Sequence, residues 1–366
     1  MRPKLEVVIA DDSPFTCRLL ATYLRAAGLE VVATTGNGRV LVELVKKHRP
    51  DVITLDLDMP GLDGLSALEI LMREVPTPVV VVSGVSGRAA TRTLAALEAG
   101  AVDFVLKYEP GADTDPEALR REIVAKVEAA SRIRVIRTLP PRQAETKPAP
   151  GGVVVDFPEL PPRDRLIERL LPGGVVVIGA STGGPLALRQ LLTELPEDFP
   201  GALIVVQHMP ASFTGVLAAQ LNRQIRLPVT EARDGQRLEP GKVLVAPGGK
   251  HLLLTPDACI ALSDGPEVHG HRPAIDVTMQ SAAQLFGARV TGIQLTGMGS
   301  DGAQGILTIH LKGGATYAQD ASSAAVPGMP ERAVETGAVG TIARPTDIGR
   351  QLAFQLKSKR RRQRAC

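Results

Sequence analysis

Four consecutive β-branched residues, Val175 to Ile178, lead directly into a glycine-rich turn, and this feature constrains the fold most strongly. A short apolar β-branched run is typical of a strand buried on both faces of a parallel sheet. The turn at 179–184 reads GASTGG, and Pro185 after it suits the first turn of a helix. A strand followed by such a turn and a helix puts Ser181 at the carboxyl edge of a sheet, where open α/β folds bind ligands. The turn is therefore either a phosphate cradle or a serine nucleophile beside an oxyanion site.

Residues 4 to about 130 alternate between strand and helix patterns. The predicted strands are Leu5–Ala10, Glu30–Ala33, Val52–Asp56, Val79–Ser83 and Phe104–Leu106, and the predicted helices include Cys17–Ala27, Leu65–Arg73, Thr91–Ala99 and about Pro116–Arg132. Five βα units predict an α/β fold with a doubly wound parallel sheet and helices on both faces.

Polar residues gather at the ends of these strands. Asp11 and Asp12 follow the first strand, Asp56 ends the third, Ser83 ends the fourth and Lys107 follows the fifth. A lone aspartate in such a place would usually cap a helix, but parallel strands bring all five side chains to one edge. Three crowded carboxylates repel one another and favour a cation, and oxygen ligands suit Mg²⁺. The lysine and the hydroxyl can hold the oxygens of a phosphoryl group.

The stretches VVIADDSPF, ITLDLDMPGLDGL, VVVVSG and GAVDFVLK resemble the receiver domain of bacterial two-component response regulators, which has a flavodoxin-like (βα)₅ fold. The resemblance implies that Asp56 accepts a phosphoryl group from a histidine kinase. It also implies the remaining roles in this unit: Mg²⁺ ligands Asp11, Asp12 and Asp56, phosphoryl contacts Ser83 and Lys107, and the switch residue Phe104. Tyr108 stands where the family usually has proline.

Residues 131–172 are rich in proline and charge and show little periodicity, which predicts a linker with a short helix over Leu166–Leu171. The predicted organisation is a receiver over 1–130, this linker, a second α/β unit over 173–357 and a basic tail over 358–366. No apolar run approaches the roughly 20 residues of a membrane span, and three cysteines are too few for a disulfide framework. We therefore expect a cytoplasmic protein without membrane insertion.

The end of the chain is strongly basic. It carries six positive residues, more than the net charge of +3: Lys357, Lys359, Arg360, Arg361, Arg362 and Arg364. Such a tail can contact nucleic acid or anionic lipid. Only 3% of the residues are aromatic and none is tryptophan, so stacking on bases is not suggested. We interpret the tail as a solvated terminus and expect no nucleic-acid partner.

The second unit repeats the alternation of strands and helices. We predict strands over Val175–Ile178, Ala202–Gln207, Val290–Leu295 and Ala315–Gln319, and helices over Leu186–Leu195, Ala274–Phe286, Gly302–Leu311 and about Thr346–Lys357. The segment VLVAPGGKHLLLTPDACIALS predicts short strands joined by turns, as a hairpin excursion. A doubly wound, mainly parallel sheet follows from this pattern.

Three of these predicted strands are followed by Ser181, His208 and Asp301, so the three side chains share one sheet edge. A serine needs a base to become nucleophilic, and histidine serves near neutral pH. A carboxylate can fix the tautomer of that histidine and stabilise its charged form. Each residue taken singly is more often structural, and the short pattern Gly-x-Ser-x-Gly is common by chance. The order Ser, His, Asp also differs from that of the α/β-hydrolases.

The motifs GASTGGP, VVQHMP, EPGKVLVAPGGKH, HRPAIDV, LTGMGSDG and GMPERA resemble the catalytic domain of the chemotaxis protein-glutamate methylesterase family, CheB. The resemblance implies the triad Ser181, His208 and Asp301, an oxyanion contribution from the backbone of Met298, and Thr182 beside the nucleophile. His271 and Arg272 match a segment that borders the active site. The residues Ala321 and Pro327 depart from the family's usual acid and aromatic residue.

What the resemblance implies is a phosphorylation-regulated hydrolase. It would demethylate glutamate methyl esters, and deamidate glutamines, on methyl-accepting chemotaxis receptors. Mg²⁺ would serve the receiver, and no cofactor would serve the esterase. Two alternatives are a nucleotide-binding module, which lacks the Lys-Ser/Thr pair of a P-loop, and a DNA-binding regulator, for which no helix-turn-helix pattern follows the linker.

Overall fold

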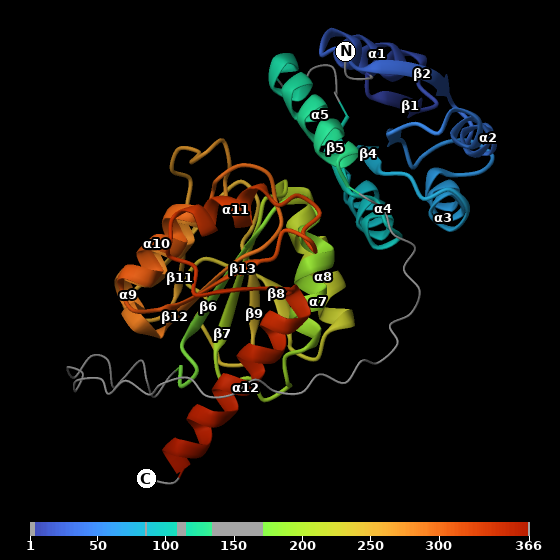
Figure 1. Ribbon diagram of the computed structural model, residues 1–366. Coiled ribbons are helices and arrows are strands. Elements are labelled where there is room, and N and C mark those ends of the chain that lie inside the picture. Colours follow the sequence, from blue (N-terminus) through green and yellow to red (C-terminus); the bar gives the residue numbers. More distant parts are fainter. Residues whose placement is uncertain (1–3, 85, 108–114, 134–170, 365–366) are drawn as a thin grey trace.

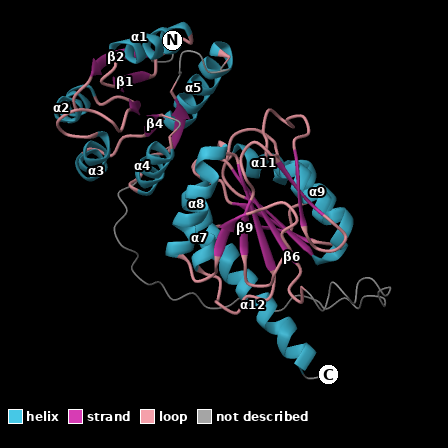
Figure 2. Cartoon of the chain, turned by 180° about the vertical axis from the view of Figure 1, so that it is seen from behind, coloured by secondary structure: helices cyan, strands magenta, loops and turns pink. Residues whose placement is uncertain are grey.

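The computed structural model describes residues 4–84, 86–107, 115–133 and 171–364, with side chains described up to residue 354. The chain forms two α/β units that lie against each other, each built on a parallel sheet (Figure 1). Figure 2 shows the same arrangement from behind, with helices flanking the strands of the larger unit. Within the described residues, we find no helix with the length and apolar character needed to cross a membrane.

The N-terminal unit is the predicted five-stranded parallel sheet, in the order β2-β1-β3-β4-β5. Helices α1 and α5 pack on one face and α2, α3 and α4 on the other. The elements are β1 (Glu6–Ala10), α1 (Pro14–Ala26), β2 (Glu30–Thr35), α2 (Gly38–His48), β3 (Val52–Leu55), α3 (Gly64–Glu74), β4 (Val79–Ser83), α4 (Gly87–Glu98), β5 (Asp103–Leu106) and α5 (Pro116–Ser131).

The predicted strands of this unit are confirmed to within two residues, but α1 and α4 begin earlier than predicted. The cause is side-chain capping at their N-termini. The hydroxyl of Ser13 accepts from the N–H of Thr16, and that of Ser86 accepts from the N–H of Ala89, so both helices gain a first turn. Tyr108 and the helix predicted over Leu166–Leu171, apart from Leu171 itself, lie outside the described residues.

The C-terminal unit has a seven-stranded parallel sheet in the order β14-β13-β12-β6-β7-β9-β8 and a separate antiparallel hairpin, β10-β11. The strands are β6 (Val175–Ala180), β7 (Ala202–Gln207), β8 (Val229–Glu231), β9 (Val243–Val245), β10 (His251–Leu254), β11 (Ile260–Ser263), β12 (Val290–Gln294), β13 (Ala315–Gln319) and β14 (Thr341–Ala343). The helices are α7 (Gly184–Thr193), α8 (Ala211–Gln224), α9 (Ile275–Phe286), α10 (Ala303–Leu311), α11 (Gly328–Glu335) and α12 (Pro345–Arg364), with a 3₁₀ turn at Gly287–Arg289.

Two predictions for this unit need correction. The hairpin excursion is confined to β10 and β11, because β9 joins the main sheet between β7 and β8. Helix α12 continues to Arg364, so it runs beyond the predicted end at Lys357 and through most of the predicted basic tail. Two helices, two strands and the 3₁₀ turn were not predicted at all, namely α8, α11, β8, β14 and Gly287–Arg289.

The order of the strands places the functional edge of each sheet. Strand β6 lies between β7 and β12, so the chain leaves it toward one side and later returns to the other. In the N-terminal unit β1 has the same position between β2 and β3. Ligand sites of doubly wound sheets form at the carboxyl ends of such strands, where the diverging loops leave a crevice. Ser181 directly follows β6, and Asp11 directly follows β1.

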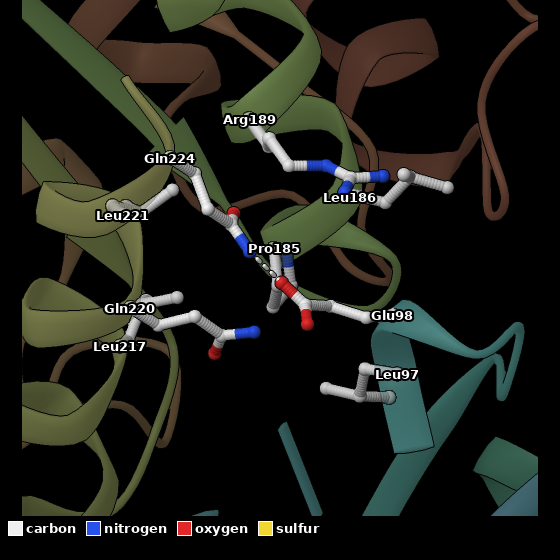
Figure 3. A pocket seen from close by; sticks show the side chains of 9 residues that line it. All are labelled: Leu97, Glu98, Pro185, Leu186, Arg189, Leu217, Gln220, Leu221 and Gln224. Carbon is white, nitrogen blue, oxygen red and sulfur yellow. Dashed lines mark hydrogen bonds between the residues drawn. The ribbon is translucent and has the colours of Figure 1, made fainter. Parts of the chain in front are cut away.

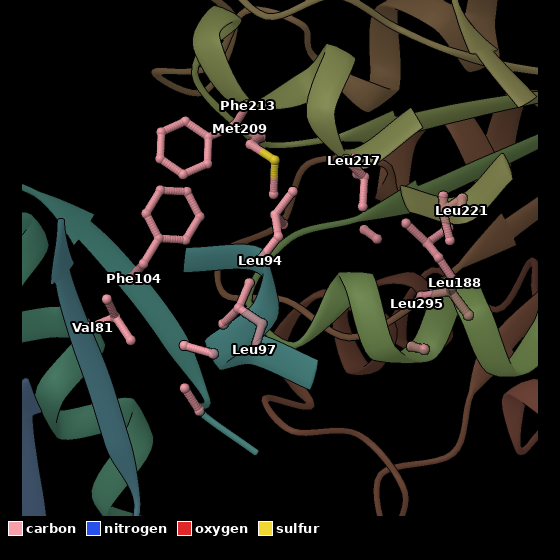
Figure 4. Packing of buried hydrophobic residues seen from close by; sticks show 14 of the residues in the cluster. Val81, Leu94, Leu97, Phe104, Leu188, Met209, Phe213, Leu217, Leu221 and Leu295 are labelled. Atoms are coloured by element: carbon pink, nitrogen blue, oxygen red, sulfur yellow. The ribbon is translucent and has the colours of Figure 1, made fainter. Parts of the chain in front are cut away.

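The two units share a continuous apolar contact. Helix α4 packs against α7 and α8, and one buried cluster runs from the N-terminal sheet through this contact into the C-terminal sheet. Figure 4 shows the ring of Phe104 beside that of Phe213, and Leu94 and Leu97 of α4 belong to the same buried cluster as Leu217 of α8. The two phenyl rings stack at 4.5 Å between centroids. The face of the N-terminal unit formed by α4 and β5 is therefore a buried interface.

Candidate active site

Ser181 stands at the tight turn between β6 and α7. Its N–H donates to the carbonyl of Thr296 at 3.0 Å, and its carbonyl accepts from the side-chain amide of Gln207 at 2.9 Å. Gly183 has a φ of 76°, a left-handed conformation that favours glycine. A Cβ on Gly297 would lie 2.7 Å from the Cβ of Ser181, so the next loop passes directly against the serine. The glycines of these two motifs allow that close approach.

His208 and Asp301 form a buried pair beside this turn. The Nε2 atom of His208 lies 2.7 Å from Oδ2 of Asp301, and their side chains are only 5% and 2% exposed. The backbone N–H groups of Ile275 and Asp276 donate to Asp301 at 2.7 and 2.9 Å. Burial acts to raise the pKa of Asp301, but these hydrogen bonds and that of His208 outweigh it and hold the pKa below its ordinary value. Asp301 is therefore a carboxylate aimed at the histidine.

The second nitrogen of His208, Nδ1, is buried and has no hydrogen-bond partner in the described part of the chain. Since Nε2 faces a carboxylate, it carries the proton, and Nδ1 is then free to accept one. A buried polar atom without a partner costs free energy and is usual at sites where a substrate or reactive group completes the bond. The pair thus presents an unused base.

His271 covers the ring of His208, with their centroids 3.7 Å apart and their planes 16° from parallel. Burial and the neighbouring His208 lower the pKa of His271 to about 4, so it is neutral at physiological pH. The guanidinium of Arg272 donates to the carbonyls of Asp264 and Gly265 at 3.1 and 2.9 Å, which holds it on its own loop.

A cavity of about 650 Å³ lies between the two units and joins these residues. Its wall brings together every residue predicted for the esterase site except Asp301, which lies behind His208: Ser181, Thr182, His208, His271, Arg272 and Met298. Phe104, Leu106 and Lys107 of the N-terminal unit line the same cavity. Ser181 therefore faces a space that is closed on one side by the receiver-like unit.

Four of the five residues predicted for the N-terminal unit also converge, namely Asp11, Asp12, Asp56 and Lys107. Carboxylate oxygens of Asp11, Asp12 and Asp56 all lie within 4.8 Å of one another. The ammonium of Lys107 lies 2.7 Å from Asp56 and 3.0 Å from Oδ2 of Asp11. Burial by itself lowers the pKa of Lys107, but the carboxylate of Asp56, with that of Asp11, raises it above its ordinary value. Ser83 instead accepts from the hydroxyl of Thr93 at 2.6 Å.

The donor set at this edge fits Mg²⁺. It consists of carboxylate oxygens alone, the ligand type that Mg²⁺ prefers. The Oδ2 atom of Asp11 is buried and, despite the nearby ammonium of Lys107, has no hydrogen-bond partner within the described chain. Burial raises the pKa of Asp11 although the ammonium of Lys107 acts to lower it, which indicates that the ionised form is only partly compensated and would gain from a cation.

One bond crosses directly between the two sites, and no feature of the sequence predicted it. The hydroxyl of Thr182, next to Ser181, donates to Oδ2 of Asp103 at 2.5 Å. Asp103 lies next to Phe104, and the ammonium of Lys126 donates to the carbonyl of Phe104 at 2.6 Å. A second polar contact between the units, from Gln224 to Glu98, closes a narrow gap between α4, α7 and α8 (Figure 3).

Two comparisons with protein families agree with this architecture. Residues 7–115 match the model of the response regulator receiver domain, and residues 176–352 match that of the CheB methylesterase. Both matches cover the units that hold the two sites.

Curated relatives match over almost the whole chain. One from Symbiobacterium thermophilum is 42% identical, covering 92% of this chain and 93% of the relative. One from Pyrococcus horikoshii is 39% identical, covering 93% and 91%. Both are named protein-glutamate methylesterase/protein-glutamine glutaminase. The solved CheB methylesterase catalytic domain of Thermotoga maritima is 37% identical and covers 50% of this chain and 98% of that one, with a TM-score of 0.49.

Proposed function

This chain belongs to the protein-glutamate methylesterase/protein-glutamine glutaminase family, and we propose that Ser181, His208 and Asp301 perform its hydrolytic chemistry. The enzyme demethylates glutamate methyl esters and deamidates glutamines, and it is regulated by phosphorylation of its receiver domain. We take methyl-accepting chemotaxis receptors as its substrates. The observation that carries the catalytic assignment is the buried His208–Asp301 pair, which leaves Nδ1 of His208 without a partner in a residue that lines the same cavity as Ser181.

The reaction proceeds through an acyl-enzyme. The Oγ atom of Ser181 attacks the ester carbonyl while Nδ1 of His208 takes the hydroxyl proton. His208 then delivers that proton to the departing methoxy oxygen, methanol leaves, and the glutamyl group stays on Ser181. A water molecule attacks next, again with His208 as the base, and the proton returns to Ser181 as the glutamate carboxylate is released. With glutamine as substrate the same steps release ammonia.

Asp301 and the backbone supply the electrostatics. Asp301 keeps the proton of neutral His208 on Nε2 and stabilises the imidazolium that forms during each transfer. The N–H of Met298 serves the oxyanion, with Thr182 beside it, and one such donor contributes about 3 kcal/mol to transition-state stabilisation. His271 and Arg272 border the substrate, and the neutral ring of His271 shields His208 from water.

In the receiver, Asp56 accepts a phosphoryl group from a chemosensory histidine kinase. Asp11, Asp12 and Asp56 would hold Mg²⁺, which offsets the charge of the phosphoryl oxygens and orients them when it is bound. Lys107 already pairs with Asp56 and would follow the phosphoryl oxygens. Ser83 would exchange its bond to Thr93 for a phosphoryl contact. We propose that the reaction takes place in the cytoplasm. We also propose that the chain consists of a receiver domain (1–130), a linker (131–172), a catalytic domain (173–357) and a basic tail (358–366).

We infer that the unphosphorylated receiver covers the esterase site. This is supported by the shared cavity, by the stack of Phe104 on Phe213 and by the bond from Thr182 to Asp103. A phosphoryl group on Asp56 would draw Ser83 and Phe104 toward it and thereby weaken the contact between the receiver and the catalytic unit. Phosphorylation then shifts a two-state equilibrium and adds no catalytic group.

The test is methanol release from methylated receptor membranes, measured with and without a phosphodonor. Ser181→Ala should abolish release in both conditions while the chain stays folded. Ser322→Ala, which changes an exposed serine bonded to Asp320, is the matched control and should keep the wild-type rate. Near-normal activity of Ser181→Ala would remove Ser181 from its role as nucleophile.

A further inference from the structure

Asp276, the second residue of α9, is a buried acid with no part in the reaction described above. It is only 3% exposed, and it does not line the cavity that Ser181 faces. Its Oδ1 atom accepts from the N–H groups of Gly302 and Gly305 at 3.0 and 2.7 Å. Its Oδ2 atom lies 3.0 Å from Nε2 of His269. Both oxygens of this carboxylate are therefore engaged.

These bonds and those of Asp301 are reciprocal. Asp301, just before α10, accepts from the first two N–H groups of α9, while Asp276, in α9, accepts from the first turn of α10. The N-cap position of α10 is Gly302, which has no side chain to cap the helix. The carboxylate of Asp276 takes that place, where the helix dipole also favours a negative charge. The loop that carries Asp301 is thus fixed from both sides.

His269 connects this arrangement to the other face of the site. The N–H and carbonyl groups of Val268 and His271 pair across a two-residue turn made by His269 and Gly270. Both turn residues are left-handed, with φ of 54° and 74°. The turn points His269 at Asp276 and sets His271 on the ring of His208. A single turn therefore contacts His208 directly and reaches Asp301 through Asp276.

We propose that Asp276, held by His269, is a positioning residue that sets the orientation of Asp301 and, through it, of His208. This inference rests on the proposed function and names a residue that the reaction steps do not use. Because Asp276 does not line the substrate cavity, its loss lowers kcat and leaves KM unchanged. A misplacement of about 1 Å in a catalytic group can cost on the order of 100-fold in rate.

A purely structural cap would act differently, and a matched control separates the two. Thr278, also buried in α9, donates to the carbonyl of Leu252 at 2.7 Å. Thr278→Val removes one buried hydrogen bond from the same helix without touching Asp301. Asp276→Asn keeps an oxygen that can accept from Gly302 and Gly305, so it should restore most of the activity that Asp276→Ala loses.

The experiment uses the full chain with phosphodonor and measures kcat, KM, thermal unfolding and the downfield proton resonance of the His208–Asp301 hydrogen bond. We expect Asp276→Ala to lower kcat about 10- to 100-fold at unchanged KM and to lose that resonance. Thr278→Val should keep the wild-type kcat and the downfield resonance, although its unfolding temperature should be lowered about as much as that of Asp276→Ala. If Asp276→Ala keeps the kcat of Thr278→Val, or raises KM instead, the inference is wrong.

A second pair of variants serves if Asp276→Ala does not fold. The His269 side chain is 42% exposed, so its replacement leaves the core intact. His269→Ala should lower kcat, and His269→Gln, whose amide can donate to Asp276, should restore it; equal rates for these variants and the wild type overturn the inference. Ser181→Ala in the same assay tests the proposed function separately, since an active Ser181→Ala refutes the nucleophile whatever Asp276 does.

Discussion

Replacing Asp103 with alanine should raise the basal esterase rate of the unphosphorylated enzyme. The carboxylate of Asp103 accepts a hydrogen bond across the interface from the hydroxyl of Thr182, the residue after the nucleophile, with 2.5 Å between the two oxygen atoms. Its other contacts, with the N–H of Phe104 and the ammonium of Lys126, lie within the receiver. They do not cross the interface, so among the contacts of Asp103 the bond to Thr182 is the one that uncovering the cleft would break.

The size of the effect follows from that single bond. A hydrogen bond to a charged group contributes about 1.5–3 kcal/mol, and about 1.4 kcal/mol changes an equilibrium constant tenfold. Loss of the bond should therefore shift the balance between covered and open enzyme about 10- to 150-fold. The observed rate cannot exceed that of a fully uncovered site, so an increase of about tenfold is the firm expectation.

The assay is methanol release from methylated receptor membranes without phosphodonor, with Asp103→Ala compared to wild type. Asp103→Asn, which keeps an acceptor oxygen, should show a smaller increase. Glu98→Ala removes an exposed interface contact to Gln224 and should change the rate least. A folded Asp103→Ala enzyme whose basal rate equals that of the wild type would refute the reasoning, because the cover would then be held by the apolar contact alone.

Three further outcomes are expected. Asp56→Asn should block labelling by a small phosphodonor, which in the wild type should require Mg²⁺, and should leave the basal rate unchanged; label on another residue contradicts the assignment. A chain that begins at Pro141 should have a raised basal rate and no response to phosphodonor, and a folded but slow chain would exclude simple covering. His271 has a pKa of about 4 when folded against an ordinary 6.5, so below pH 6.5 the unfolded chain binds the extra proton first. The unfolding free energy should thus fall as pH drops from 6.5 to 4, and denaturant titrations of His271→Gln should show a flatter profile.

Much of the fold could be predicted because buried parallel strands have a local pattern. The runs at Val79–Ser83 and Ala202–Gln207 are apolar up to their last residue, and both predicted boundaries are confirmed. Helix α8 was missed although Phe213, Leu217 and Leu221 recur every four residues and point to one buried face. The strands β8 and β14 have three residues each, too few to show any period.

The candidate site divides in the same way. Residues that follow strands, such as Ser181 and His208, could be placed on one edge because parallel topology brings strand ends together. The roles of Asp103 and Asp276 could not be predicted from the sequence, since each bonds to a partner far away in the sequence. Asp103 bonds to Thr182 across an interface between units, and Asp276 bonds to Gly302, which lies 26 residues later. Such contacts depend on tertiary packing and have no local signature.

The contact of α4 with α7 and α8 joins two parts of one polypeptide. The fraction of uncovered enzyme therefore does not depend on the enzyme concentration. A cover supplied by a separate protein would dissociate on dilution, so idle enzyme would become active wherever it was scarce. In the covering that we propose, the cover and the site belong to one polypeptide, so the local concentration of the cover stays the same at any copy number. The fraction of open molecules then reports the phosphorylation signal alone, and a cell can change the amount of enzyme without resetting its threshold.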